Sequence, residues 1–220
     1  MGKKIRVTVY NEFIHEQEYE NIRKVYPDGI HGCIAAFLEE EADITVRTAT
    51  FEMPEHGLSE EVLADTDVLI FLRHGRKYEF SDDVAERVRQ HVLMGMGLLA
   101  LHSAHESRPM QRLMGTTGAL SWREMGENER VWVIDRTHPV AQGLGEYIDI
   151  EHEEMYGEPF AIPAPDELVF ISWFRGGEVM RSGCTFKRGF GNALEYLKPV
   201  RPVATAPVKS FHAQVPPEKI

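Results

Sequence analysis

Three polar clusters follow predicted strands, and their residue types suit proton transfer or metal binding. One cluster contains His74, one contains His102, Ser103 and His105, and one is the acidic run that contains Glu154. Because the carboxyl ends of parallel strands meet at one edge of a sheet, we expect His74, His102 and Glu154 to approach one pocket. Imidazoles and carboxylates around one cleft suit a divalent metal such as zinc, or general acid–base chemistry on a polar metabolite.

The cluster at residues 102–105 stands at a predicted strand-to-helix turn and leaves alternatives open. Ser103 is placed like a hydrolase nucleophile, but the flanking glycines of Gly-x-Ser-x-Gly are missing, so a helix-capping serine is the alternative. His102 and His105 either take part in catalysis, with His74 and His105 as metal ligands, or only hydrogen-bond within the turn.

The acidic run mixes surface residues with candidate site residues. Glu151 and Glu153 are expected on the solvated surface, whereas Glu154, Tyr156 and Glu158 stand where the chain is expected to leave a strand. We expect Glu154 to be catalytic, and Tyr156 and Glu158 to bind substrate.

Polar residues also follow the first predicted strand. Asn11, Glu12 and His15 are expected to reach the same cleft and to bind substrate. The alternative is that His15, like His31, is an exposed loop histidine.

The first half of the chain predicts an α/β domain with a doubly wound parallel sheet. Short apolar runs alternate with helical periodicity, which is typical of βαβ units. The expected strands and helices of this half are strands at 5–10, 44–51, 67–72 and 97–102, and helices near 30–38, 59–64 and 81–94. A long polar loop is expected from Asn11 to Asp28.

The second half predicts antiparallel strands and then an irregular tail. Strand patterns at 130–134, 147–150, 168–174 and 178–182 indicate a strand-rich extension at one edge of the sheet. From residue 190 the periodicity disappears, and prolines stand at positions 199, 202, 207, 216 and 217. We therefore expect one domain at 1–189 and an irregular tail at 190–220.

Charge and cysteine content exclude several classes of protein. The 24 basic against 35 acidic residues give a net charge of −11, which disfavours a nucleic-acid partner. No apolar run approaches the roughly 20 residues that span a bilayer, so a cytoplasmic protein is expected. Cys33 shares a predicted buried helix stripe with Phe37, and Cys184 is expected in an edge strand, so a cysteine nucleophile is not expected.

Several motifs resemble the ThuA-like, or trehalose-utilisation, family. They include Val9-Tyr-Asn-Glu-Phe-Ile-His, Tyr26-Pro-Asp-Gly-Ile-His, Leu101-His-Ser-Ala-His, Glu153-Glu-Met-Tyr-Gly-Glu and Phe170-Ile-Ser-Trp-Phe-Arg-Gly-Gly. The resemblance implies a class I glutamine amidotransferase-like variant of the flavodoxin-like fold and a role in carbohydrate metabolism. It does not imply amidotransfer, because Ser103 stands where glutamine amidotransferases have their cysteine.

Two segments depart from the family pattern. Relatives carry Trp-Gly-His-x-x-His after the third strand, whereas this chain keeps His74 and has Lys77 in place of the second histidine. Relatives also end with a strand leading into Pro-Gly-His-Glu-Thr and a final helix, a pattern missing after Gly189. The resemblance therefore implies that this chain lacks that sheet strand and closing helix.

Three functions remain open at this point. The first is an enzyme acting on trehalose, a related disaccharide or a keto-sugar, with His74, His102, His105 and Glu154 as acid–base groups around an optional divalent ion. The second is a non-catalytic sugar-binding or regulatory protein, which the loss of the second histidine favours. A Ser103 hydrolase is a third hypothesis. A small sugar is the expected partner, and self-association into a homo-oligomer is expected from the apolar sheet edge that the missing strand would leave.

Overall fold

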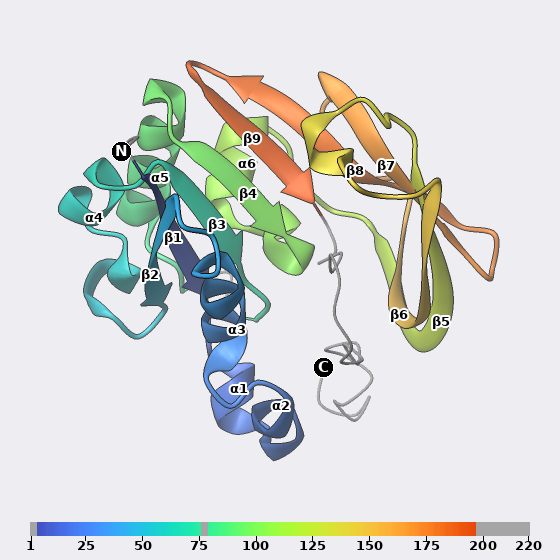
Figure 1. Ribbon diagram of the computed structural model, residues 1–220, viewed down its shortest axis with the longest axis horizontal. Helices are drawn as coiled ribbons and strands as arrows, with labels where there is room; N and C mark the ends of the chain where they lie inside the picture. The colour runs from blue at the N-terminus through green and yellow to red at the C-terminus, as the bar shows by residue number, and fades with distance from the viewer. Residues whose placement is uncertain (1–3, 76–78, 197–220) are drawn as a thin grey trace.

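A computed structural model describes residues 4–75 and 79–196, which form a nine-stranded mixed sheet with helices around one half (Figure 1). The strands are β1 (Ile5–Asn11), β2 (Ile44–Thr50), β3 (Val68–Leu72), β4 (Gly97–Leu101), β5 (Ser121–Val133), β6 (Tyr147–Gly157), β7 (Glu167–Phe174), β8 (Val179–Arg188) and β9 (Gly191–Tyr196). The helices are α1 (His15–Glu18), α2 (Glu20–Val25), α3 (Gly29–Leu38), α4 (Glu60–Ala64), α5 (Asp82–Met94) and α6 (Arg108–Met114), with 3-10 turns η1 (Pro54–Gly57), η2 (His102–Glu106) and η3 (Pro139–Ala141).

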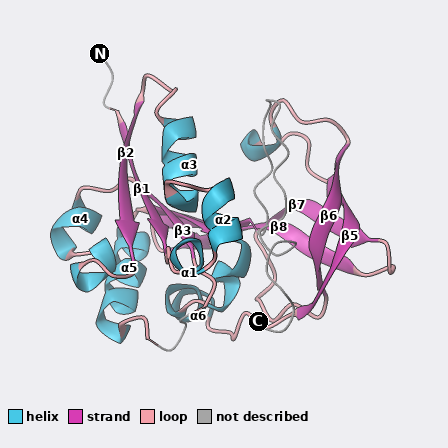
Figure 2. Cartoon of the chain, turned by 90° about the horizontal axis from the view of Figure 1, so that it is seen from below, coloured by secondary structure: helices cyan, strands magenta, loops and turns pink. Residues whose placement is uncertain are grey.

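The parallel half confirms the predicted α/β class. Strands β2, β1, β3, β4 and β9 lie side by side in that order, and each neighbouring pair is parallel. Figure 2 shows α3 on one side of β1 and β2, and α4 and α5 on the other. Each layer buries one apolar face: Ile34 and Leu38 of α3 pack with Val7 and Val9, whereas Val88 of α5 belongs to the opposite cluster.

The predicted helix starts at Ser59 and Ser81 are confirmed. The hydroxyl of Ser59 accepts a hydrogen bond from the Val62 amide, and that of Ser81 accepts one from the Val84 amide. Each cap satisfies an amide that has no partner within its helix, which explains why this local signal could be interpreted from sequence.

The antiparallel extension is also confirmed, and β9 connects it to the parallel half. Strands β8, β7, β5 and β6 continue the sheet, with β9 parallel to β4 and antiparallel to β8. The expectation that the chain is irregular from residue 190 is therefore wrong for 191–196. This short strand is stabilised by a ladder on both sides, and Ala193 is fully buried between them. The sheet strand that we expected to be missing is present, and the rest of the tail, 197–220, lies outside the described residues.

Two other expectations about chain segments are corrected. The stretch predicted as a long loop contains α1 and α2, which are fixed by the burial of Ile14 and Ile22. The acidic run does not leave a strand at residue 154: β6 continues to Gly157, so Glu154 and Tyr156 are strand residues.

Helix α3 is rotated relative to its predicted orientation, so Cys33 is exposed rather than buried. The buried side of the helix is centred on Ile34, Ala35 and Leu38, while Phe37 is 49% exposed. Cys184 is buried, and its strand β8 is an interior strand and not the predicted edge strand.

We expect the two cysteines to differ strongly in reactivity. In native protein at mildly alkaline pH, a thiol reagent should modify Cys33 rapidly and Cys184 only on unfolding, because access limits thiolate attack. Stopped-flow absorbance with a disulfide reagent measures this, and Cys33→Ser should remove the fast phase. A fast phase that survives in Cys33→Ser would contradict the burial of Cys184.

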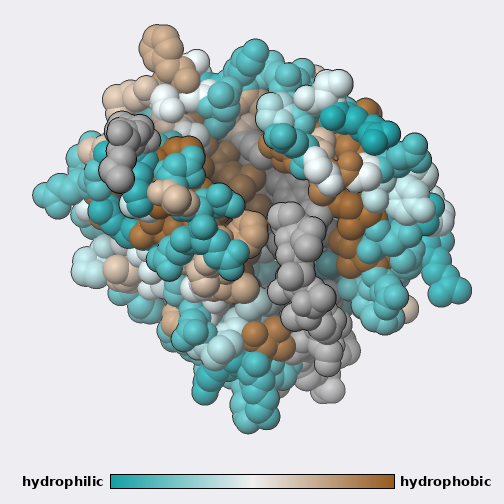
Figure 3. All heavy atoms as spheres, in the orientation of Figure 1, coloured by the Kyte–Doolittle hydropathy of each residue, from teal (hydrophilic) through white to brown (hydrophobic). Residues whose placement is uncertain are grey.

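Most of the face seen in Figure 3 is polar, with apolar residues gathered in separate patches, as expected for a chain with a net charge of −11. Among the described residues, no helix is long and apolar enough to cross a membrane.

Candidate functional site

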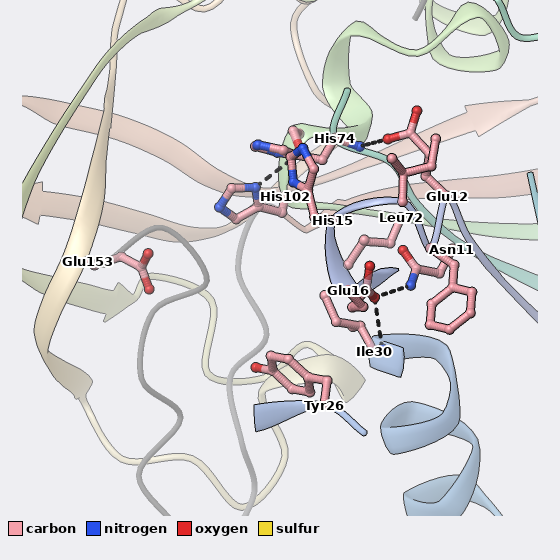
Figure 4. Close-up of a pocket in the computed structure, with 13 residues that line it drawn as sticks. Asn11, Glu12, His15, Glu16, Tyr26, Ile30, Leu72, His74, His102 and Glu153 are labelled. Carbon is pink, nitrogen blue, oxygen red and sulfur yellow. Dashed lines mark hydrogen bonds between the residues drawn. The ribbon is translucent and has the colours of Figure 1, made fainter. Parts of the chain in front are cut away.

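A pocket lies at the carboxyl ends of β1, β3 and β4 (Figure 4). Residues directly after these strands form its polar side, as the parallel sheet predicts. The residues that line it are Asn11, Glu12, Phe13, Ile14, His15, Glu16, Tyr26, Ile30, Leu72, His74, His102, Ser103 and Glu153.

Glu12 fixes the backbone that carries His74. One oxygen of its buried carboxylate, Oε2, accepts hydrogen bonds from the amides of His74 at 2.9 Å and Gly75 at 2.5 Å. A carboxylate that accepts two amides forms strong charge-assisted bonds, so the segment after β3 is attached directly to the end of β1.

Glu16 also fixes pocket segments to one another, at the side of the pocket formed by α1 and α3. Its Oε1 atom accepts hydrogen bonds from the Asn11 side-chain amide at 2.6 Å and from the Ile30 backbone amide at 3.1 Å. These bonds connect β1, α1 and the start of α3. Asn11 therefore lies in the pocket with its amide nitrogen already engaged.

Two residues of the pocket lining have a left-handed backbone, Phe13 with φ of +57° and His102. His102 is the one that stands at the predicted strand-to-helix turn. It follows β4 directly and has φ of +53°, a left-handed conformation that is uncommon for a residue other than glycine. Such strain persists only where the surroundings hold it, and it clusters at functional sites. The strained position of this strand-to-helix turn is therefore His102 and not Ser103.

Two buried side chains, Glu154 and Tyr156, contact the nitrogen atoms of the His102 ring. The Nε2 atom lies 3.4 Å from Oε2 of Glu154, and the Tyr156 hydroxyl lies 3.2 Å from Nδ1. A carboxylate beside Nε2 favours the tautomer that carries its proton there, which leaves Nδ1 as a proton acceptor. Burial, followed by the charge of Glu154, raises the pKa of Tyr156, so this phenol stays protonated.

Ser103 connects the two pocket imidazoles. Its hydroxyl donates to the Arg73 carbonyl at 2.5 Å, and its oxygen lies 3.0 Å from Nδ1 of His74 and 3.3 Å from Nδ1 of His102. The contacts therefore run from Glu154 through His102 and Ser103 to His74. In this arrangement the serine proton is already donated to a backbone carbonyl.

A third imidazole completes this side of the pocket. The ring of His15 packs edge-on against that of His74, with centroids 4.5 Å apart. Burial lowers the pKa of His15, partly offset by the charges of Glu12 and Glu16, so the ring is neutral at neutral pH. A neutral imidazole can accept a proton from a bound ligand.

The structure brings together most of the residues that the sequence analysis selected. Asn11, Glu12, His15, His74, His102 and Ser103 line the pocket, as predicted. Glu154 and Tyr156 contact His102 from outside the lining.

His105 and Glu158 lie away from the pocket lining. Nδ1 of His105 bonds to the Gly118 carbonyl at 2.6 Å, and Glu158 pairs with Arg181 at 2.8 Å. Although burial acts to raise the pKa of Glu158, the bonds from Arg181 and from the Phe160 amide lower it overall. The His105 ring meets that of Phe160 edge-on with centroids 5.8 Å apart, and His105 does not share the pocket lining with His74. In the part of the chain that the structure describes, no three His, Cys, Asp or Glu side chains are grouped to hold a metal ion.

Lining residues that the sequence analysis did not select include Glu16, Tyr26, Ile30 and Glu153. Glu153 was expected on the surface, but β6 curves so that this side chain reaches the pocket. For Tyr26 and Ile30, the signal was the Tyr-Pro-Asp-Gly-Ile-His motif, which was recognised but not assigned to the site.

We expect Glu12→Gln to lower the free energy of unfolding by about 1–3 kcal/mol, because hydrogen bonds to a buried charge are lost. Urea denaturation measures this change. Glu20→Gln is the matched control, since Glu20 is exposed beside Lys24 and should change stability by less than about 0.5 kcal/mol. Equal stability of the Glu12→Gln variant and the wild type would contradict the anchoring role of Glu12.

Solved structures with the same fold include ThuA-like and other proteins. A protein described as ThuA-like from Parabacteroides merdae ATCC 43184 aligns with a TM-score of 0.62 and 13% identity, over 89% of this chain and 79% of that one. A second ThuA-like protein, from Bacteroides uniformis ATCC 8492, has a TM-score of 0.59 and 11% identity, over 89% and 82%. A β-galactosidase from Bacillus circulans sp. alkalophilus has a TM-score of 0.54 and 12% identity, over 88% of this chain but 28% of that one. At these identities the likeness shows the fold alone.

The sequence itself identifies the family more directly. No curated protein sequence gives a match. A family model described as trehalose utilisation matches residues 6–185, which include every residue of the pocket lining. The chain belongs to the ThuA family.

Proposed function

We propose that the chain is an enzyme that performs acid–base chemistry on a sugar derivative, such as a disaccharide or keto-sugar, in the pocket at the ends of β1, β3 and β4. The observation that carries the proposal is the strained His102, which lines the pocket while Glu154 and Tyr156 hold its ring. Family membership implies a carbohydrate-related role, which supports a sugar as the ligand.

In this mechanism His102 is the base. The Glu154 carboxylate, 3.4 Å from Nε2, stabilises the imidazolium that forms when the His102 ring accepts a proton from the sugar. His74 and His15 lie beside it as hydrogen-bonding partners for hydroxyl groups, with His74 oriented by Ser103. Asn11 and Glu12 shape the opposite part of the polar wall.

The test is a panel of disaccharides, sugar acids and keto-sugars, each examined for binding by ligand-observed NMR and for turnover by product analysis. The proposal predicts one class of sugar that both binds and is converted. Binding without conversion of any sugar would favour the non-catalytic alternative, in which the same pocket only recognises its ligand. No binding by any sugar would contradict both.

We also propose a flavodoxin-like classification for the parallel half, a cytoplasmic location and a homo-oligomeric state. The order β2-β1-β3-β4-β9 supports the classification, because it matches the doubly wound order of that fold. Similar structures include proteins of Salmonella typhimurium that are described as cytoplasmic, which supports the location. A sedimentation experiment tests the oligomeric state.

A further inference from the structure

The antiparallel extension has an outward face that the mechanism above does not use. Trp132 of β5 lies opposite Tyr147 of β6, and Trp173 of β7 lies opposite Val179, the first residue of β8. Residues directly opposite in an antiparallel pair point to the same side of the sheet. Arg130, two residues before Trp132 on β5, lies opposite Trp173 and so connects the two pairs. The four apolar side chains therefore share one side of the sheet.

These four apolar side chains are between 39% and 48% exposed. The other side of the same strands is the core side, where Val131 and Val133 are buried. Figure 2 shows β5 and β6 on the far side of the molecule from helices α1 to α6. A strand face in water normally carries polar side chains, so a row of large apolar groups across four strands marks an interaction surface.

The charged groups on this side of the sheet neutralise each other. Arg130 binds Asp149 through two hydrogen bonds of 2.7 and 2.9 Å. The guanidinium carbon of Arg130 also lies 4.0 Å from the ring centroid of Tyr147 and 5.4 Å from that of Trp132. We call Arg130, Asp149 and the four apolar residues the aromatic face. Its two charges sum to zero, whereas the whole chain carries −11.

The arrangement of the rings disfavours a sugar as the occupant of the aromatic face. The planes of Trp132 and Tyr147 meet at 63°, and Arg130 lies over the ring of Tyr147. A pyranose stacks on an open ring face, and here the two rings do not form one flat platform. A nucleic acid or another strongly charged partner finds no net charge on this face to attract it.

The edge of the sheet is a poor site for a second copy of the chain. Strand β6 is the last strand of the sheet, and Asp149 and Glu151 are exposed on it. Charged side chains on an edge strand oppose pairing with another strand, and two copies joined through β6 would bring these acids together. A second copy is therefore expected to meet the face of the extension and not its edge.

We propose that the aromatic face binds the same face of a second copy of this chain around a two-fold axis. The proposal rests on the proposed homo-oligomeric state and names its interface. Two copies of so acidic a chain repel each other, and the neutral aromatic face allows apolar contact without like charges in contact. A two-fold interface must be self-complementary, which apolar rings around an internally paired Arg130 and Asp149 satisfy. Tryptophan, tyrosine and arginine are also the residues that dominate interface energies.

The size of the aromatic face sets the expected strength of the dimer. A standard stable interface buries about 800 Å² on each partner. Three half-exposed aromatic side chains offer on the order of 300 Å², so polar residues around them supply the rest. We therefore expect a weak dimer with a dissociation constant in the micromolar range. Because the contact is apolar, added salt should not dissociate it.

Sedimentation velocity of the full chain tests the proposal. The wild type should change from monomer to dimer over about 1–300 µM, at low and at high salt. Trp132→Glu should stay monomeric over the same range, because it places an unpaired charge in the apolar contact. Trp122→Glu is the matched control and should dimerise like the wild type, since Trp122 is 54% exposed on the same strand but lies outside the aromatic face.

Tryptophan fluorescence tests whether the aromatic face itself is covered. The chain has three tryptophans, and Trp132 and Trp173 are the two on this face. In Trp122→Phe both remaining tryptophans report on the face, so the emission maximum should move to longer wavelength when the dimer is diluted to monomer. An emission maximum that stays constant while the dimer dissociates would place the interface elsewhere.

The outcomes separate the interface from the oligomeric state. Thermal unfolding checks that each variant is folded, and Val179→Glu, on another strand of the same face, replaces Trp132→Glu if that variant is not. A dimer that survives in the folded variant, or that high salt dissociates, overturns the aromatic face as the interface and leaves the homo-oligomeric state standing. A wild type that is monomeric at every concentration overturns both, and neither result touches the proposed sugar chemistry.

Discussion

His102→Asn is expected to lower kcat/KM for the sugar substrate by about 10²–10⁴-fold, the usual contribution of a general acid–base group. Asparagine is chosen because residue 102 has φ of +53°, which asparagine tolerates better than most residues. The variant should therefore keep the fold and the pocket while losing the proton acceptor at Nδ1. Steady-state kinetics and thermal unfolding, measured on the same preparation, separate these two effects.

The matched control is His152→Asn. His152 lies on the exposed side of β6, where its Nδ1 atom contacts the Gly126 carbonyl at 3.3 Å. This variant should keep kcat/KM within about twofold. Comparable activity of His102→Asn and His152→Asn would remove His102 from the catalytic step.

Phe71→Ala is expected to cost about 3–5 kcal/mol of the free energy of unfolding, the largest stability effect we predict. Phe71 is 1% exposed in β3, stacks on Tyr10 with centroids 4.5 Å apart, and meets Phe80 edge-on at 5.7 Å. Truncation leaves a cavity between rings that cannot collapse onto it, because the sheet and α5 fix their positions. Urea denaturation measures the loss.

Phe37→Ala provides the comparison. The same chemical change at a position that is 49% exposed on α3 should alter the free energy of unfolding by less than about 0.5 kcal/mol. A loss of several kcal/mol there would show that the exposed side of α3 is covered in solution. Such a result would support self-association through that helix.

Local signals explain which elements could be predicted from the sequence. The apolar run at 68–72 predicts a strand, and Ser59 and Ser81 predict helix starts, each from only a few neighbouring residues. These elements agree with the structure. Strand β9 could not be predicted in the same way. It is held by hydrogen bonds to β8 and to β4, and β4 lies about ninety residues earlier in the chain. Composition and proline content do not indicate such a long-range pairing.

The site shows the same division. The positions of His74 and His102 follow from the rule that parallel strands end at one edge of the sheet. Glu153 lines the pocket from β6, where it pairs with Glu127 of β5 beside the register shifts of that ladder, and this long-range pairing leaves no local signal in the sequence. For His105, three residues after His102, the direction of the side chain depends on the turn η2, which local spacing did not resolve.

The most direct test of the account is the protonation state of His102, measured by long-range ¹H–¹⁵N NMR of protein with ¹⁵N-labelled histidine. The His102 signals are assigned as those missing in His102→Asn. The account predicts the Nε2–H tautomer at neutral pH, with an unprotonated Nδ1 whose signal shifts when the sugar binds. A proton on Nδ1, or an Nδ1 signal that no bound sugar affects, would contradict the claim that His102 is the base of a carbohydrate site.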